Sequence, residues 1–235
     1  TIQSTFSSVD INAGAGITFN AGTTVSAGTN VTIDGGLAGG APGTNTVTLG
    51  TVTANAGNVV IGGTAPDPNV TAAGTITATS GYVAIDGYNI QTAAINADTN
   101  NAGNAIKLTG GNNVTVGGTL TASGAATDLG IDIDPVNVNL NADLLATGAI
   151  NVTASNDINV AAGVTVQADT DSTGAEALAI TADDDNAGGG DLVANTTSTL
   201  QGASVTLDGD NVTTGTVTAD SGDATITASA AITLN

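Results

Sequence analysis

The sequence has no cysteine, methionine, tryptophan or histidine, and its only cationic side chain is Lys107. The absence of histidine and cysteine excludes imidazole-based acid–base catalysis and thiol nucleophiles. The absence of cysteine also removes disulfides as a source of stability, although it neither requires nor excludes export. With only two phenylalanines and two tyrosines, a globular core built on large aromatic side chains is not expected. We therefore expect a protein that is not an enzyme and requires no cofactor.

The charge is strongly one-sided, because 21 acidic residues against one lysine give a formal net charge of -20. Nucleic acid and anionic membrane surfaces would be repelled, so we expect neither as a partner. No apolar run of roughly 18 residues and no charged-then-apolar leader occurs, so we expect no membrane insertion. The chain is expected to be a mature secreted chain or a cytosolic one, and composition favours an extracellular or cell-surface location.

Apolar residues are periodic along the whole chain and consist mostly of alanine, valine, isoleucine and leucine, which suits a thin core. Pairs of the form apolar-x-apolar recur with a mean spacing of about 24 residues, inside the range typical of solenoids. Individual spacings vary from 19 to 28 residues. The second residue of each pair, taken here as the anchor, is Ile11, Ile33, Ile61, Ile85, Leu108, Ile133, Val152, Ile180, Leu207 or Ile226.

Two further sets of short segments accompany the anchors. The first set has the form T-x-T-A, with threonine expected to point outward and the apolar residue inward; it comprises 24–27, 51–54, 75–78, 119–122, 165–168 and 216–219, with looser copies at 94–97, 143–146 and 199–202. The second set is weaker and comprises 17–19, 46–49, 114–116 and 158–160.

These three sets predict an all-β fold, a right-handed parallel β-helix of about ten rungs of roughly 24 residues, with three short strands per rung. The domain is a single β-solenoid over 1–235, either an excerpt of a longer solenoid or a stacking subunit. Length variation is expected in corner loops, and the largest are 37–45, 62–69, 98–104 and 183–191. The rung around Ile133 is expected to be the least regular, because Pro135 interrupts strand pairing. Segment 172–179 is interpreted as a loop and not a helix.

The repeat text resembles a known family. The segments AINVTASNDINVAAGVTVQAD (149–169) and VDINAGAGITFNAGTTVSAGTNVTIDG (9–35) resemble the repeats of filamentous haemagglutinin-like adhesins and related large bacterial exoproteins. The resemblance implies a secreted protein with a long right-handed parallel β-helix that acts as a surface adhesin or fibre. The N-terminal secretion module of that family is not recognisable here, so the export route stays open.

Two functions follow as hypotheses. The first is a self-associating filament subunit that forms a homopolymer by end-to-end or lateral contact, since apolar strands run up to Ile2 and Ile232 without a cap. The second is an adhesin segment that binds a cell-surface glycan or a protein receptor. Two minor alternatives are an ice-binding face formed by the outward T-x-T rows, expected to be irregular because rung length varies, and a sugar-cleaving carboxylate pair. Such pairs are Asp132 with Asp134 and Asp208 with Asp210.

Two acidic loops are candidates for calcium, which prefers hard oxygen ligands. Solvated acidic loops without metal are the alternative, because neither loop has EF-hand spacing. The candidate ligands are Asp169, Asp171 and Glu176 in one loop, and Asp183, Asp184, Asp185 and Asp191 in the other.

Six N-x-T sequences are candidate glycosylation sites in an exported chain. A turn asparagine followed by a Val-Thr strand produces the same pattern without any glycan. We expect the asparagine of one, Asn151, to lie inside a strand and the others at corners. The six asparagines are Asn30, Asn69, Asn113, Asn151, Asn195 and Asn211.

Overall fold

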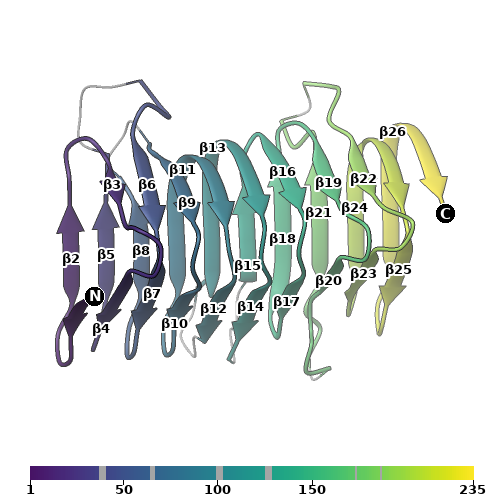
Figure 1. Ribbon diagram of the computed structural model, residues 1–235. Helices are drawn as coiled ribbons and strands as arrows, with labels where there is room; N and C mark the ends of the chain where they lie inside the picture. The colour runs from purple at the N-terminus through teal and green to yellow at the C-terminus, as the bar shows by residue number, and fades with distance from the viewer. Residues whose placement is uncertain (37–40, 64–66, 99–102, 125–128, 173, 186) are drawn as a thin grey trace.

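The protein is a rod of stacked coils in which short parallel strands follow one another along the axis (Figure 1). This computed structural model describes residues 1–36, 41–63, 67–98, 103–124, 129–172, 174–185 and 187–235. The described residues form 26 strands and no helix, so no helix among them could cross a membrane. The coils form a parallel β-solenoid of about nine turns, which confirms the predicted fold class.

A ten-stranded parallel sheet covers one side of the rod. Its strands are the predicted T-x-T-A segments, joined by one additional strand near the N-terminus. In chain order they are β1 (Ile2–Ser4), β4 (Thr24–Ala27), β7 (Thr51–Ala54), β10 (Ile76–Ala78), β12 (Ile95–Asp98), β14 (Leu120–Ser123), β17 (Leu144–Ala146), β20 (Thr165–Gln167), β23 (Thr199–Gly202) and β25 (Thr216–Ala219).

A sixteen-stranded sheet forms the rest of the wall, in two columns of strands. The first, here called the anchor column, contains the anchor residue of every coil. Its strands are β2 (Val9–Asn12), β5 (Val31–Asp34), β8 (Val59–Gly62), β11 (Val83–Thr92), β13 (Ile106–Val116), β15 (Leu129–Asp134), β18 (Ala149–Ala154), β21 (Leu178–Ala182), β24 (Val205–Thr214) and β26 (Ala224–Leu234).

The second column, here called the ladder column, contains the third strand of each coil. In four coils this strand is the second half of a long strand, β11, β13, β24 or β26. The separate strands are β3 (Ile17–Thr18), β6 (Thr46–Leu49), β9 (Asn69–Ala72), β16 (Asn137–Leu140), β19 (Ile158–Val160) and β22 (Leu192–Ala194).

The register of the anchor column is the one that the sequence predicts. Ile11 pairs with Ile33, and every later anchor pairs with the next, ending with Leu207 opposite Ile226. The anchors from Ile33 to Leu207 are buried, and together with the inward residues of the other columns they form one aliphatic core. Burying each such side chain contributes about 1.5–3 kcal/mol.

Differences in coil length leave the ten-stranded sheet in register, whereas the sixteen-stranded sheet has three register shifts among its described residues, between Gly87 and Asn89, Leu129 and Ile131, and Gly209 and Asn211. The ten-stranded sheet keeps its pairing from β1 to β25 without a register shift. The expectation of an irregular T-x-T array is therefore wrong, because the extra residues of long coils lie between strands. The rows do change in composition, since Asn96 on β12 and Leu145 on β17 take the place of the second threonine.

Pro135 lies at a corner and not inside a strand. Strand β15 ends at Asp134, because proline has no N–H to donate to the ladder. The coil stays paired on both sides, and the carbonyl of Pro135 accepts a hydrogen bond from Ser155 N at 3.3 Å. Gly110 in the neighbouring coil leaves room for the ring, since a Cβ there would lie 2.9 Å from Pro135 Cβ. The coil around Ile133 is thus paired with both neighbours, and its one irregularity, a register shift between Leu129 and Ile131 against β18, lies before the anchor and not at Pro135.

The described residues of the predicted loops lie between strands, except that Gly62 ends β8, Asn69 begins β9 and Asp98 ends β12. Residues 37–40, 64–66, 99–102 and 186, which belong to the four largest, lie outside the described residues. Segment 172–179 contains no helix among its described residues, and β21 begins at Leu178. Its Thr173 also lies outside the described residues.

Candidate functional site

A row of asparagine and aspartate side chains runs along the start of the ladder column. In each coil the member is the residue immediately before the first inward apolar residue of the ladder-column strand. Strand pairing aligns the members of successive coils. The row occupies seven consecutive coils: Asn69, Asn89, Asn113, Asn137, Asp157, Asp191 and Asn211. We call it the amide ladder.

Hydrogen bonds between coils link the asparagines in one direction. Asn89 Nδ2 donates to Asn69 Oδ1 at 2.8 Å, and Asn113 Nδ2 donates to Asn89 Oδ1 at 3.0 Å. Asn137 Nδ2 donates to Asn113 Oδ1 at 3.1 Å. The first member, Asn69, donates to the carbonyl of Gly43 at 2.6 Å. The Nδ2 of each asparagine therefore donates to an acceptor in the preceding coil. These bonds fix the spacing of the coils at this corner.

Carboxylates continue the ladder toward the C-terminus. Asp157 Oδ1 accepts the backbone N–H of Asp191 at 3.0 Å. Asp191 Oδ1 accepts both the backbone N–H and the Nδ2 of Asn211, at 3.2 and 2.8 Å. A carboxylate only accepts hydrogen bonds, so the donors again come from the following coil, as in the asparagine part of the ladder.

A shallow polar groove of about 560 Å³ lies beside the asparagine part of the ladder, over β9, β11, β13 and β16. The ladder members Asn69, Asn89 and Asn113 line it, together with outward residues that include Gln91, Thr115 and Asn139. No charged side chain lines it. Within the described residues the side chains of Gln91 and Asn139 have no hydrogen bond. The groove thus offers unengaged amides on an otherwise strongly acidic protein.

Sequence reasoning missed this site, although a signal was present. Three ladder members, Asn69, Asn113 and Asn211, were interpreted only as glycosylation candidates. Asparagine or aspartate before the apolar residue of the third strand recurs as NVT, NIQ, NVT, NVN, DIN, DLV and NVT. Aligning those triplets coil by coil would have placed the seven side chains in one row.

The structure also shows how the six candidate glycosylation asparagines are held. Asn151 lies inside β18 as expected, but β9, β13 and β24 include the three ladder members, which were expected at corners. All four use Nδ2, the atom to which a glycan would be attached, as a hydrogen-bond donor. Asn30 precedes β5, and its Oδ1 accepts a hydrogen bond from Asn58 N. Asn195 follows β22, and its Oδ1 accepts a hydrogen bond from Thr197 N. Glycosylation stays a prediction, and Asn30 and Asn195 fit it best.

The acidic loop near residue 185 uses carboxylates to accept backbone amides. Asp183 Oδ1 accepts the N–H of Gly188 at 2.9 Å, and Asp185 Oδ1 accepts that of Ala187 at 3.0 Å. Asp184 is exposed, while Asp191 belongs to the amide ladder. The backbone of Asp183 has φ of 59°, a left-handed conformation that aspartate tolerates.

The other acidic loop follows β20. Asp169 is buried, has φ of 56°, and its Oδ1 accepts the N–H of Gly174 at 3.4 Å. Asp171 is exposed, and Glu176 Oε2 is buried and has no hydrogen-bond partner among the described residues. Among the described residues of both loops, no three acidic side chains come together as metal ligands. Calcium binding stays a prediction that the geometry of these residues does not favour.

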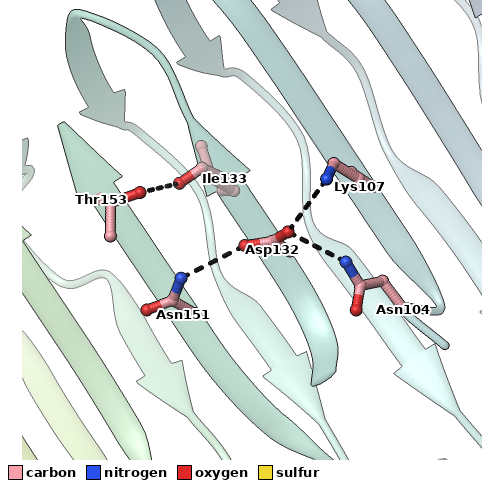
Figure 2. Close-up of polar contacts among 6 residues, drawn as sticks. All are labelled: Asn104, Lys107, Asp132, Ile133, Asn151 and Thr153. Carbon is pink, nitrogen blue, oxygen red and sulfur yellow. Dashed lines mark hydrogen bonds and ion pairs between the residues drawn. The ribbon is translucent and has the colours of Figure 1, made fainter. Parts of the chain in front are cut away.

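Lys107 joins a polar cluster that spans three coils (Figure 2). Its Nζ lies 3.6 Å from Asp132 Oδ2, which also accepts a hydrogen bond from Asn104 Nδ2 at 2.9 Å. Asn151 Nδ2 donates to the other oxygen, Asp132 Oδ1, at 3.3 Å. The lysine side chain is 50% exposed and that of Asp132 only 14%. The cluster therefore stabilises one largely buried carboxylate, and both oxygens of Asp132 are engaged by neighbouring coils.

One carboxylate near this cluster has a perturbed acidity. Partial burial, and after it the negative charge of Asp67, raises the pKa of Asp86 above its ordinary value of 3.8. The positive charge of Lys107 acts in the opposite direction. Asp86 lies on β11, one coil before the Lys107–Asp132 pair.

No protein-family model, curated protein or solved structure matches this chain. The repeated coils are compatible with β-helical repeat proteins.

Proposed function

We propose that this protein is an extracellular structural rod that builds a filament or fibre. The observation that carries the proposal is the continuous stack of parallel coils around one aliphatic core, because each coil repeats the same contacts with its neighbours along a single axis.

The side walls favour growth along the axis over side-by-side packing. With a net charge of -20, two parallel rods repel each other at low ionic strength. Salt screens this repulsion over about 10 Å at 0.1 M. We therefore expect single filaments at low salt and lateral bundles when the salt concentration is raised.

Electron microscopy and light scattering of the purified 235-residue chain test the proposal. We expect particles several times longer than one 235-residue unit, single at low salt and bundled at high salt. Val193→Lys, which adds a positive charge at a valine that is 42% exposed on the side wall, should lower the salt concentration at which bundles form. Rods of one unit length at every protein and salt concentration would contradict the proposal.

A second candidate function is that of an adhesin segment. The uncharged groove beside the amide ladder supports it, because unengaged amides are suited to binding a polar ligand. Retention of the chain on immobilised cell-surface glycans or receptor proteins, and its loss when the groove amides are removed, tests this function separately from filament formation.

A further inference from the structure

We infer that the groove over β9, β11, β13 and β16 binds a neutral linear polysaccharide that lies along the rod axis, with one sugar ring per coil. This inference deepens the second candidate function and is independent of filament formation. It rests on the charge, the free hydrogen-bonding groups and the repeat of the groove.

The first step concerns charge. The chain carries 21 acidic residues, yet amides, hydroxyls and two apolar residues line the groove. The ladder changes from amide to carboxylate at Asp157, just beyond the coil in which the groove ends at Asn139. An anionic polymer would be repelled by the surrounding wall, and a cationic one would be attracted to the acidic coils instead of this neutral stretch. An uncharged polymer is the class that this surface suits.

The second step concerns hydrogen bonding. A side-chain amide has two N–H donors and two acceptor lone pairs. Asn113 uses one N–H toward Asn89 and one lone pair toward Asn137, which leaves one of each. Gln91 and Asn139, on the outward row, use none among the described residues. Sugar hydroxyls both donate and accept, so they match this mixture of unengaged groups.

The third step concerns the repeat. Parallel strands lie about 4.8 Å apart, so the groove presents a similar set of polar groups at that interval along the axis. This interval is close to the length of one pyranose ring in an extended chain. No aromatic side chain lines the groove for a sugar to stack on, so each ring contributes little. Affinity is then expected to rise with the number of linked sugars.

Titration calorimetry with cello-oligosaccharides tests the inference, and light scattering of the same samples records particle length, so that binding and filament formation are measured separately. We expect no measurable heat with glucose and binding that tightens from cellobiose to cellohexaose. Gln91→Ala combined with Asn139→Ala should weaken cellohexaose binding about tenfold, the loss expected for one or two hydrogen bonds. Neither side chain is bonded within the described protein, so the double variant should melt at the parent temperature.

Asn159→Ala is the matched control, because Asn159 is the next residue of the same outward row but does not line the groove. It should leave binding within about twofold. The inference is overturned if cellohexaose and chitohexaose both fail to bind, or if Asn159→Ala weakens binding as much as the groove variant. Equal or tighter binding of a sulfated oligosaccharide or an extended peptide would also overturn it.

Discussion

Asn113 donates its side-chain N–H to Oδ1 of Asn89 at 3.0 Å, although 24 residues separate the two in the chain. The same amide oxygen of Asn89 also accepts from Asn112 at 3.0 Å. The Oδ1 atom of Asn89 thus accepts hydrogen bonds from two side chains of the next coil, Asn112 and Asn113. Since Asn113 also accepts from Asn137, it lies in the middle of a continuous run of bonds.

Replacing this central amide should destabilise the rod. Asn113→Ala removes the donor to Asn89 and leaves the partly buried Nδ2 of Asn137 without its acceptor. We expect a loss of about 1–3 kcal/mol in the free energy of unfolding, measured by urea denaturation. Asn159→Ala, on the exposed outward row, should change it by less than about 0.5 kcal/mol. Equal effects of the two variants would mean that the ladder does not stabilise the fold.

Replacing either of two buried threonines by valine should increase the stability of the folded protein. Thr92 and Thr214 are buried at inward positions, and within the part of the chain that the structure describes their Oγ1 atoms have no hydrogen-bond partner. Valine has nearly the same shape and removes the unsatisfied hydroxyl, so Thr214→Val should stabilise the protein by about 1 kcal/mol. The matched control is Thr213→Val on the outer face of β24, which should have little effect. A lower melting temperature for Thr214→Val would contradict this expectation.

The Lys107 cluster predicts unequal effects from its two charged members. Lys107→Met should cost less than about 1 kcal/mol, because the lysine is half exposed. Asp132→Ala should cost more, about 1–3 kcal/mol, because it leaves the amides of Asn104 and Asn151 without their acceptor. Urea midpoints of both variants measure the difference. A larger loss for Lys107→Met would show that the ion pair, and not the amides, holds the cluster.

Asp86 should make a small contribution to the dependence of stability on pH. Its pKa is raised in the folded protein, so the folded state binds the proton more tightly than the unfolded state. The resulting stabilisation is fully present below the unfolded value of 3.8 and is lost as pH rises through the raised folded pKa. Asp86→Asn should therefore make the stability less dependent on pH and raise it at neutral pH. Melting temperatures measured at several pH values follow this change. An unchanged pH profile would refute the assignment.

Chelation should leave the melting temperature unchanged. The carboxylates of Asp183 and Asp185 already accept backbone amides, and no three acidic side chains of the described loops gather as ligands. A calorimetric scan with and without EDTA at matched ionic strength measures this. A drop that added calcium restores would show that calcium binds, and Asp185→Asn would then identify the loop, with Asp220→Asn as the control outside it.

The repeating features of the fold were predictable from sequence, because period-two burial reports which side chains point inward. Anchors such as Ile85 and Leu108 were aligned by counting, and the structure pairs them as counted. Side-chain contacts between coils were not predictable in this way. The bond from Asn211 to Asp191 depends on how the chain turns between β21 and β24, and no local pattern reports that path. The row itself could have been found by aligning the triplets coil by coil, but the bonds between its members, such as that from Asn89 to Asn69, could not.

The fixed register over unequal coils has a further consequence for how such a chain tolerates change. From Ile133 to Val152 the chain takes 19 residues and from Val152 to Ile180 it takes 28, yet both pairs stack directly. Insertions or deletions at a corner alter the outline of the rod and leave its pitch unaffected. The corners are thus positions where a foreign peptide could be grafted with its neighbours undisturbed, and where related genes could differ in length while coding for the same rod.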